Sequence, residues 1–274
     1  MPELPEVETI VRDLRPHLVG RHLRRVQLLR ESVLRFPDAA TFVHLAEGQQ
    51  VRALRRRGKF IHVCLESGGS LVVHLGMSGN LTLQTREEPW APHTHLVLDL
   101  DDGGQLRYRD PRRFGRVALG APELLEQLGV VPRLGPEPLS GRFASSGFTE
   151  TMRASGRVVK AVLLDQAAVA GCGNIYADEA CFLARVRPTR RGHTLTRGEA
   201  ARLTLALPAV MRQALRLRGS SFATFRDGFG AKGDAFEALF VYGRSGLPCV
   251  RCGDILRQTR VGGRTTVFCR RCQR

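Results

Sequence analysis

The sequence has no apolar run long enough to cross a membrane, and its start does not resemble a secretory leader. A bilayer span needs roughly 18 to 20 consecutive apolar residues, and no stretch of the 274 positions meets this requirement. The chain begins MPELPEVE, which is acidic where a signal peptide is basic. We therefore expect a cytoplasmic protein with no membrane partner.

Acidic residues are scarce relative to basic ones. The chain has 42 Lys and Arg against 26 Asp and Glu, a formal net charge of +16. This excess favours a polyanionic partner, either nucleic acid or an acidic membrane surface, and we favour nucleic acid. Internal repeats at a solenoid period are also missing, which excludes a stacked-repeat architecture.

The first half of the chain changes from a helical to a strand pattern. Apolar residues at helical spacing predict an amphipathic helix that ends near Gly20, with Pro16 bending it or ending it early. From His22 to about Gly120, short apolar runs alternate with turn residues and no long helical pattern intervenes. This arrangement favours an antiparallel β-sandwich or barrel over a parallel sheet.

The spacing of apolar residues in the second half predicts helices, followed by a small terminal unit. A linker rich in Pro and Gly precedes it, Thr196 and Glu199 form a capping-box pattern, and Pro208 is expected to kink or split the last helix. Helices are predicted over 149–155, 158–165, 173–185 and 196–218. The predicted parts are an N-terminal β domain (1–129), a linker (130–141), a helical domain (142–240) with a mobile Gly-rich loop (219–237), and a terminal finger (241–274).

Four of the seven cysteines have the spacing of a metal site. They form two Cys-x2-Cys pairs separated by sixteen residues, the pattern of a zinc ribbon, whereas two disulfides would be unusual in a reducing compartment. Four thiolates leave no open coordination position, so we expect one structural Zn²⁺ and no catalytic role for it. Residues 241–274 carry a net +7, which suits contact with phosphates. The ligands are Cys249, Cys252, Cys269 and Cys272.

The N-terminus is a candidate nucleophile. Once Met1 is removed, Pro2 presents a secondary α-amine, which at neutral pH is unprotonated far more often than a lysine side chain. Glu3 and Glu6 lie within one turn and are placed to protonate a leaving oxygen or to orient the amine. Read alone, the same residues are also an ordinary helix start with an acidic first turn.

Three Gly-rich segments are candidates for nucleic-acid contact. Asn174 in GCGNIYADE follows glycines that expose backbone N–H groups before a helix, although a plain tight turn is equally consistent. HLGMSG and DPRRFG expose Met77, Arg112 and Phe114, either as a wedge between bases or as β-domain core. Lys59 in RRRGKF is a phosphate ligand or a charged sheet rim.

Read together, these segments, with LGPEPLS, LLDQ, VYGRSGLPC and FCRRCQR, resemble formamidopyrimidine-DNA glycosylase in matching order over essentially the whole chain. The resemblance implies a multi-domain α and β fold. Its parts are an N-terminal antiparallel β-sandwich with an N-terminal helix, a helix-two-turn-helix module and a C-terminal zinc finger. It also implies a bacterial, nucleoid-associated enzyme that acts on damaged double-stranded DNA, and we expect a monomer.

The activity implied by the resemblance is removal of oxidised purines, 8-oxoguanine and formamidopyrimidines, followed by cleavage of the abasic strand. Pro2 attacks C1′ of the damaged nucleotide to form a Schiff base, Glu3 protonates the sugar ring oxygen, and elimination of the 3′ and then the 5′ phosphate follows. Lys59 is implied in phosphate contact and proton donation. Arg264 is implied in the second elimination.

The remaining roles concern DNA contact. By resemblance, Met77, Arg112 and Phe114 fill the void left by the flipped base, and Asn174 and His93 contact the strand. A further basic contact is expected between the linker and LLDQ, where Arg157 or Lys160 fits. Two alternatives stay open: an endonuclease VIII-like glycosylase for oxidised pyrimidines, and a zinc-ribbon DNA-binding protein without enzymatic activity.

Overall fold

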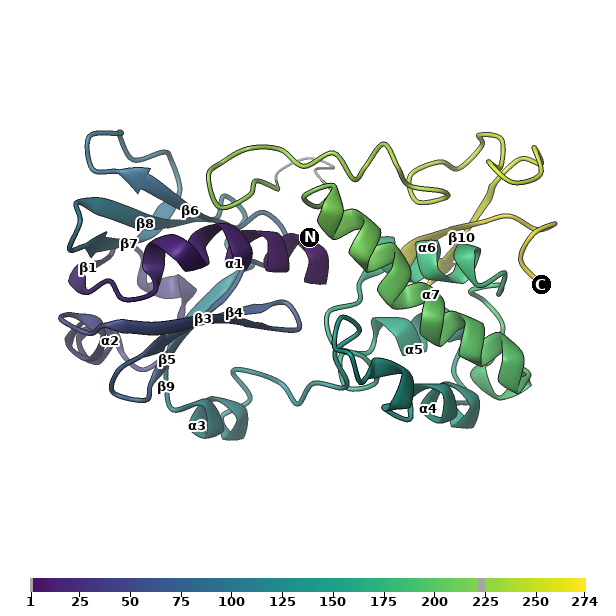
Figure 1. Cartoon of the computed structure of the whole chain (residues 1–274), viewed down its shortest axis with the longest axis horizontal. Helices are drawn as coiled ribbons and strands as arrows, with labels where there is room; N and C mark the ends of the chain where they lie inside the picture. Colours follow the sequence, from purple (N-terminus) through teal and green to yellow (C-terminus); the bar gives the residue numbers. More distant parts are fainter. Residues whose placement is uncertain (1, 221–224) are drawn as a thin grey trace. The chain divides into compact units, whose positions relative to one another are not determined.

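The computed structural model describes residues 2–220 and 225–274, and the chain forms two compact units (Figure 1). The first comprises Met1–Arg133 and Leu217–Asp234, and the second comprises Leu134–Arg216 and Ala235–Arg274. No helix among the described residues combines the length and apolarity that a membrane span requires. Each unit is described by itself below.

The first unit opens with helix α1 (Leu4–Leu18), as the apolar spacing predicts. Its predicted apolar face, Val7, Ile10, Val11, Leu14 and Leu18, is fully buried. Pro16 lies inside the helix, which continues for only two more residues. A proline this close to the end removes a single backbone hydrogen bond, so the helix tolerates it.

Two sheets sandwich α1, which confirms the predicted sandwich (Figure 1). Their side chains and those of α1 share one core. Among the described residues of this unit, all strand pairs are antiparallel except the parallel pair β2 with β9. One sheet has the order β1 (Leu23–Leu28), β7 (Thr94–Leu100), β8 (Gly104–Arg109), β6 (Asn80–Thr85). The other has the order β2 (Leu34–Phe36), β9 (Arg116–Gly120), β5 (Ser70–His74), β4 (Phe60–Leu65), β3 (Val51–Arg57).

Three short helical elements of the first unit were not predicted from the sequence. They are η1 (Glu31–Val33), α2 (Ala39–Ala46) and α3 (Pro122–Gln127). Each is at most eight residues long, too short for a helical period to stand out against the strand pattern around it. Asp38 caps α2 by accepting from the Thr41 N–H at 3.0 Å, a local signal for a helix start.

The second unit contains the four predicted helices and the terminal hairpin. The helices are α4 (Phe148–Ala154), α5 (Val159–Leu164), α6 (Asn174–Leu183) and α7 (Arg197–Arg216), with short turns η2 (Phe143–Ser145) and η3 (Gly192–Thr194). The predicted capping box at α7 is present: Glu199 N–H donates to Thr196 Oγ1 at 3.2 Å, and Thr196 N–H donates to Glu199 Oε2 at 2.8 Å. Pro208 does not split α7, which runs unbroken through it. The hairpin is β10 (Arg257–Val261) with β11 (Arg264–Phe268).

Residues 217–234 group with the first unit, whereas composition had placed them in the helical domain. The reason is a set of hydrogen bonds to the β domain: Arg226 N–H donates to Asn80 Oδ1 at 3.1 Å, and Leu83 N–H donates to Gly228 O at 2.9 Å. Arg218 pairs with Asp13 at 2.8 Å. Part of the predicted mobile loop, 221–224, lies outside the described residues.

Candidate functional site

Pro2, Glu3 and Glu6 form a buried cluster at the start of α1. Glu3 and Glu6 are 2% and 1% exposed. One oxygen of Glu6 accepts from the Glu3 N–H at 2.9 Å, and the other accepts from the N–H and Oγ of Ser220 at 2.8 and 3.0 Å. Both Glu6 oxygens are thus occupied as acceptors, which suits a carboxylate that fixes the first residues in place. Met1 lies outside the described residues.

Lys59 lies in the two-residue turn between β3 and β4, where Arg57 pairs with Phe60. Gly58 has a φ of 56° and starts the turn, a conformation that favours glycine. Lys59 is only 6% exposed. Burial, together with the charges of Lys59 and Arg116, lowers the pKa of His74 to about 4. His74 is therefore neutral at physiological pH and adds no charge beside Lys59.

Two turns of the β domain are joined through one buried carboxylate. They are residues 75–79 between β5 and β6 and residues 110–115 between β8 and β9, here called the paired turns. Asp110 is fully buried. Its Oδ1 accepts from Ser78 Oγ at 2.5 Å, and its Oδ2 accepts from the Gly115 N–H at 2.8 Å. One side chain thus bonds to both turns.

Glycine is required where the paired turns meet. A Cβ on Gly76 would lie 2.4 Å from Gly115 N, and a Cβ on Gly115 would lie 2.0 Å from the Tyr108 hydroxyl. Both distances are far below van der Waals contact, and one of the clashing groups is backbone. The glycines that punctuate HLGMSG and DPRRFG therefore permit close backbone contact between the two segments.

The side chains at the tips of the paired turns point to solvent. Met77 is 41% exposed and Phe114 is 52% exposed, so neither belongs to the β-domain core. The guanidinium of Arg112 lies 4.7 Å from the centre of the Phe114 ring. A thioether, an aromatic ring and a guanidinium thus share one surface, the combination expected of a group that enters a base stack.

Replacing Asp110 by asparagine is expected to destabilise the protein by about 1–3 kcal/mol, because in either orientation the new amide nitrogen would face a backbone donor, the N–H of Gly115 or of Arg112. Urea unfolding measures this change. Asp102→Asn is the matched control: its carboxylate accepts from a backbone N–H at 3.0 Å but is exposed, and we expect a change within about 0.5 kcal/mol. Equal effects of the two substitutions would contradict the role given to Asp110.

In the second unit, Asn174 is the first residue of α6 and lies beside the terminal hairpin. Its Nδ2 donates to Thr265 O at 3.1 Å. Thr265 follows Arg264, whose side chain is exposed at the start of β11. Asn174 and Arg264 are therefore neighbours within this unit. The glycine that precedes Asn174 adopts an extended conformation as the N-cap.

Lys160 does not qualify as a DNA contact, because its side chain is fully buried. It pairs with Asp178 Oδ1 at 2.7 Å and donates to Thr265 O at 2.9 Å. Burial raises the pKa of Asp178 although Lys160 opposes that shift. Arg157, the other candidate in this segment, is exposed and pairs with Asp165 at 2.6 Å. Of the two predicted candidates, only Arg157 has an exposed side chain.

Two buried acidic residues of α6 attach the finger to the helical module. Asp178 accepts from the Val267 N–H of β11 at 3.0 Å. Glu179 accepts from three successive N–H groups, those of Phe240, Val241 and Tyr242, at 2.8 to 2.9 Å. The finger is thus tied to the helix that carries Asn174.

The four predicted cysteines converge, with their sulfurs all within 4.8 Å of one another. Sγ separations are 4.0 Å for Cys249 with Cys272 and 3.5 Å for Cys252 with Cys269. A tetrahedron with Zn–S bonds of roughly 2.3 Å has edges of about 3.8 Å, so the set fits Zn²⁺. The first cysteine of each pair also accepts a backbone hydrogen bond at 3.4 Å: Cys249 accepts from the Arg251 N–H, and Cys269 accepts from the Cys272 N–H. The predicted zinc finger is present.

His93 is exposed before β7 and has a φ of 70°, a conformation that few residues other than glycine adopt.

The sequence did not point to four residues that position other groups: Asp110, Asp178, Glu179 and Ser220. Their signal was an acidic or hydroxyl residue inside a Gly-rich motif, a composition that is equally typical of an ordinary turn.

Comparison with known proteins finds similarity to one family along the whole chain. Family models match in order: formamidopyrimidine-DNA glycosylase N-terminal domain over 1–117, formamidopyrimidine-DNA glycosylase H2TH domain over 134–226, and zinc finger found in FPG and IleRS over 246–274. The formamidopyrimidine-DNA glycosylase of Symbiobacterium thermophilum is 45% identical over 100% of this chain and 89% of its own.

Two solved structures agree with this match. MutM (Fpg) from Thermus thermophilus is 44% identical with a TM-score of 0.89, covering 99% of this chain and 98% of its own. A Lactococcus lactis Fpg mutant bound to DNA containing Fapy-dG is 32% identical with a TM-score of 0.91, covering 99% of both chains. The chain therefore belongs to the formamidopyrimidine-DNA glycosylase family and is a zinc-finger DNA glycosylase.

Proposed function

We propose that this glycosylase removes oxidised purines from duplex DNA and then cleaves the strand through a Schiff base on Pro2. The observation that carries the proposal is the buried cluster of Pro2, Glu3 and Glu6, in which Glu6 bonds to the Glu3 N–H and to Ser220. A purine substrate is supported by the Lactococcus lactis relative, whose structure contains Fapy-dG DNA.

The chemistry uses groups of the first unit. The unprotonated Pro2 nitrogen attacks C1′ while Glu3 protonates the sugar ring oxygen, so the ring opens, the base leaves and an iminium forms. The iminium then accepts electrons as the 3′ and 5′ phosphates are eliminated in turn. We assign Lys59 to phosphate contact and proton donation because it lies in a tight turn and keeps 6% exposure, whereas Lys160 is fully buried.

Strand contacts are assigned to exposed groups and to Asn174, which is half-buried. Asn174, Arg157, Arg264 and His93 contact the backbone, with Arg264 also assisting the second elimination. Met77, Arg112 and Phe114 fill the void left by the flipped base, since stacking on exposed apolar and planar side chains offsets the cost of extrusion. We further propose that the protein acts as a monomer in the bacterial cytoplasm, at the nucleoid.

An excision assay tests the function. Duplexes with one 8-oxoguanine or one thymine glycol are compared, and faster excision of 8-oxoguanine is expected. Glu3→Gln should slow excision of 8-oxoguanine by roughly 100-fold or more, with less effect on cleavage at a pre-formed abasic site, where no base must leave. Preference for thymine glycol would favour the endonuclease VIII-like alternative, and binding without cleavage would favour a DNA-binding protein.

Phe114→Ala and Arg264→Ala are expected to change different properties of DNA binding: the first the preference for damaged duplex, the second the salt dependence of affinity. Phe114→Ala should reduce preference for damaged duplex by about tenfold at an unchanged salt slope, because it removes stacking and no charge. Arg264→Ala should lower the salt slope by roughly 0.9 on damaged and undamaged duplex alike. Salt titrations of both variants on paired substrates measure the difference. A changed slope in Phe114→Ala would remove the void-filling role.

A further inference from the structure

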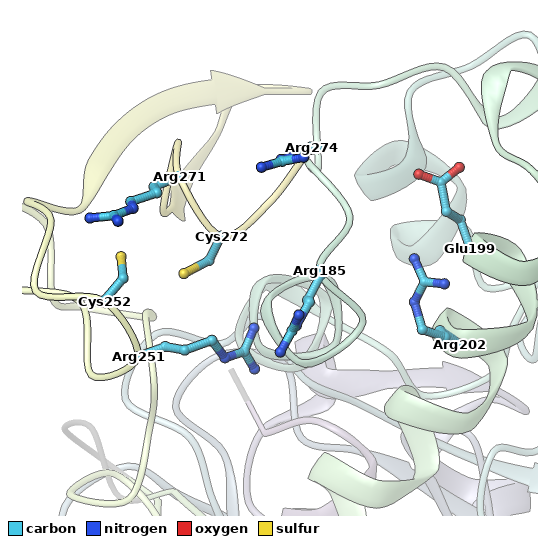
Figure 2. Close-up of a pocket in the computed structure, with 8 residues that line it drawn as sticks. All are labelled: Arg185, Glu199, Arg202, Arg251, Cys252, Arg271, Cys272 and Arg274. Atoms are coloured by element: carbon cyan, nitrogen blue, oxygen red, sulfur yellow. The ribbon is translucent and has the colours of Figure 1, made fainter.

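The second unit contains a pocket of about 460 Å³ that is lined mainly by arginines (Figure 2). They come from separate segments: the end of α6, helix α7, and the two turns that carry the cysteine pairs. All five arginines are exposed. The lining comprises Arg185, Arg202, Arg251, Arg271, Arg274, Glu199, Cys252 and Cys272.

The positive charge of this pocket exceeds the negative charge beside it. Glu199 is already paired with Arg190, through contacts of 2.6 and 3.1 Å, whose guanidinium is not part of the lining. Within residues 2–220 and 225–274, none of the five lining arginines forms an ion pair. Zinc with four thiolates carries a charge of −2, which offsets only part of the positive charge of the five arginines. Their guanidinium groups stay protonated at any physiological pH.

Two of the guanidiniums are held in place by the end of α6. Arg202 Nε donates to Ala184 O at 3.2 Å. Arg251 donates to Phe182 O at 3.3 Å and lies 4.4 Å above the centre of the Phe182 ring. Each of these bonds uses one of the five N–H donors of a guanidinium. The other donors of each side chain stay available to a ligand, and the guanidinium that carries them is fixed in position.

Arg185 occupies a backbone position that favours glycine. It directly follows the C-cap of α6 with a φ of 59°, the left-handed conformation in which helices commonly end on glycine. An arginine here carries a conformational cost of about 1 kcal/mol. Figure 2 shows its side chain among those that line the pocket.

From the excess charge, the fixed guanidiniums and the pocket volume, we propose that this pocket binds a ligand with more than one phosphate group. Guanidinium forks match phosphate oxygens in geometry as well as charge. The ligand is either the backbone of a nucleic acid strand or a free oligophosphate. It is not the phosphate assigned to Asn174, because Asn174 begins α6 and the pocket lies at its other end, about 15 Å away for ten residues.

The test compares two double variants of the zinc-loaded full chain. Arg202→Gln with Arg271→Gln removes two pocket charges. Arg212→Gln with Arg270→Gln removes two exposed charges from the same helix and the same cysteine turn but outside the lining. Calorimetric titration with tripolyphosphate should show at least about tenfold weaker binding for the pocket variant than for the control. Zinc content confirms that both variants keep the finger.

A salt titration on a long undamaged duplex separates the two sources. If strand phosphates occupy the pocket, the pocket variant has a salt slope lower by roughly 0.9 per lost contact than the control. If the ligand is a free oligophosphate, tripolyphosphate binding is lost and the slope is unchanged. Equal behaviour of both variants in both titrations overturns the proposal. Because neither readout uses base excision, failure here is distinguishable from failure of the proposed function.

Discussion

Pro2→Gly is expected to lower the yield of protein trapped on DNA by about 100-fold or more when borohydride is added to a duplex with one 8-oxoguanine. Glycine keeps an α-amine but loses the ring that fixes its orientation, and misplacement of a reacting group by about 1 Å costs two orders of magnitude. The imine of a primary amine must also gain a proton before it acts as an electron sink, whereas a proline iminium is already charged. Gel quantification of the covalent complex is the measurement.

Two controls accompany this experiment. Pro5→Ala removes a proline from the first turn of the same helix without touching the α-amine, so trapping should be retained. Lys59→Arg removes the other amine assigned to the proposed mechanism and keeps its positive charge, so the covalent complex should still form while the steps that need a proton from Lys59 slow. Loss of trapping only in Lys59→Arg would assign the Schiff base to Lys59, and undiminished trapping in Pro2→Gly would contradict the role given to the proline ring. Mass spectrometry of active enzyme should find Met1 missing.

Loss of the metal is the second large effect. Cys249→Ser should lower zinc from about one ion per chain to a trace, because metal binding supplies roughly 10–16 kcal/mol and folding of a finger is coupled to it. The hairpin that carries Arg264 then loses its support, and DNA affinity should fall by roughly 100-fold as several phosphate contacts go with it. Metal analysis and a binding titration measure the two losses.

Cys64→Ser is the matched control, since Cys64 is a half-buried free thiol of β4 outside the metal set. It should retain zinc and full DNA affinity. Wild-type DNA affinity in a zinc-free Cys249→Ser protein would show that the finger is dispensable for binding. Chelation of the native protein should reproduce the Cys249→Ser result.

The extent of prediction from sequence varied with the kind of signal. Helix α1 and the cysteine site follow from spacing, because one face of a helix and one metal tetrahedron each restrict residues that are near in the chain. Lys160 shows where spacing fails. A basic residue in a basic protein is expected at the surface, yet its partner Asp178 is eighteen positions away and only the packing of α5 against α6 brings them together.

The same limit applies to the segment 217–234. Its glycines predicted a loop, but composition does not indicate which body a loop packs against. That choice depends on Asn80 and Asp13, more than a hundred positions earlier. Long-range hydrogen bonds of this kind leave no periodic trace in a sequence.

The bonding of both turns to Asp110 has a practical consequence for protein engineering. One carboxylate and the close contact of two glycine backbones hold residues 75–79 and 110–115 together. The two turns can therefore be exchanged between proteins only as one unit. Exchange of one turn with a homologous glycosylase would leave a mismatched half. Grafting both turns together with Asp110 and Tyr108 preserves the shared support. Variant libraries in these turns are therefore best built by changing the exposed tip residues and keeping Asp110 and the two glycines constant.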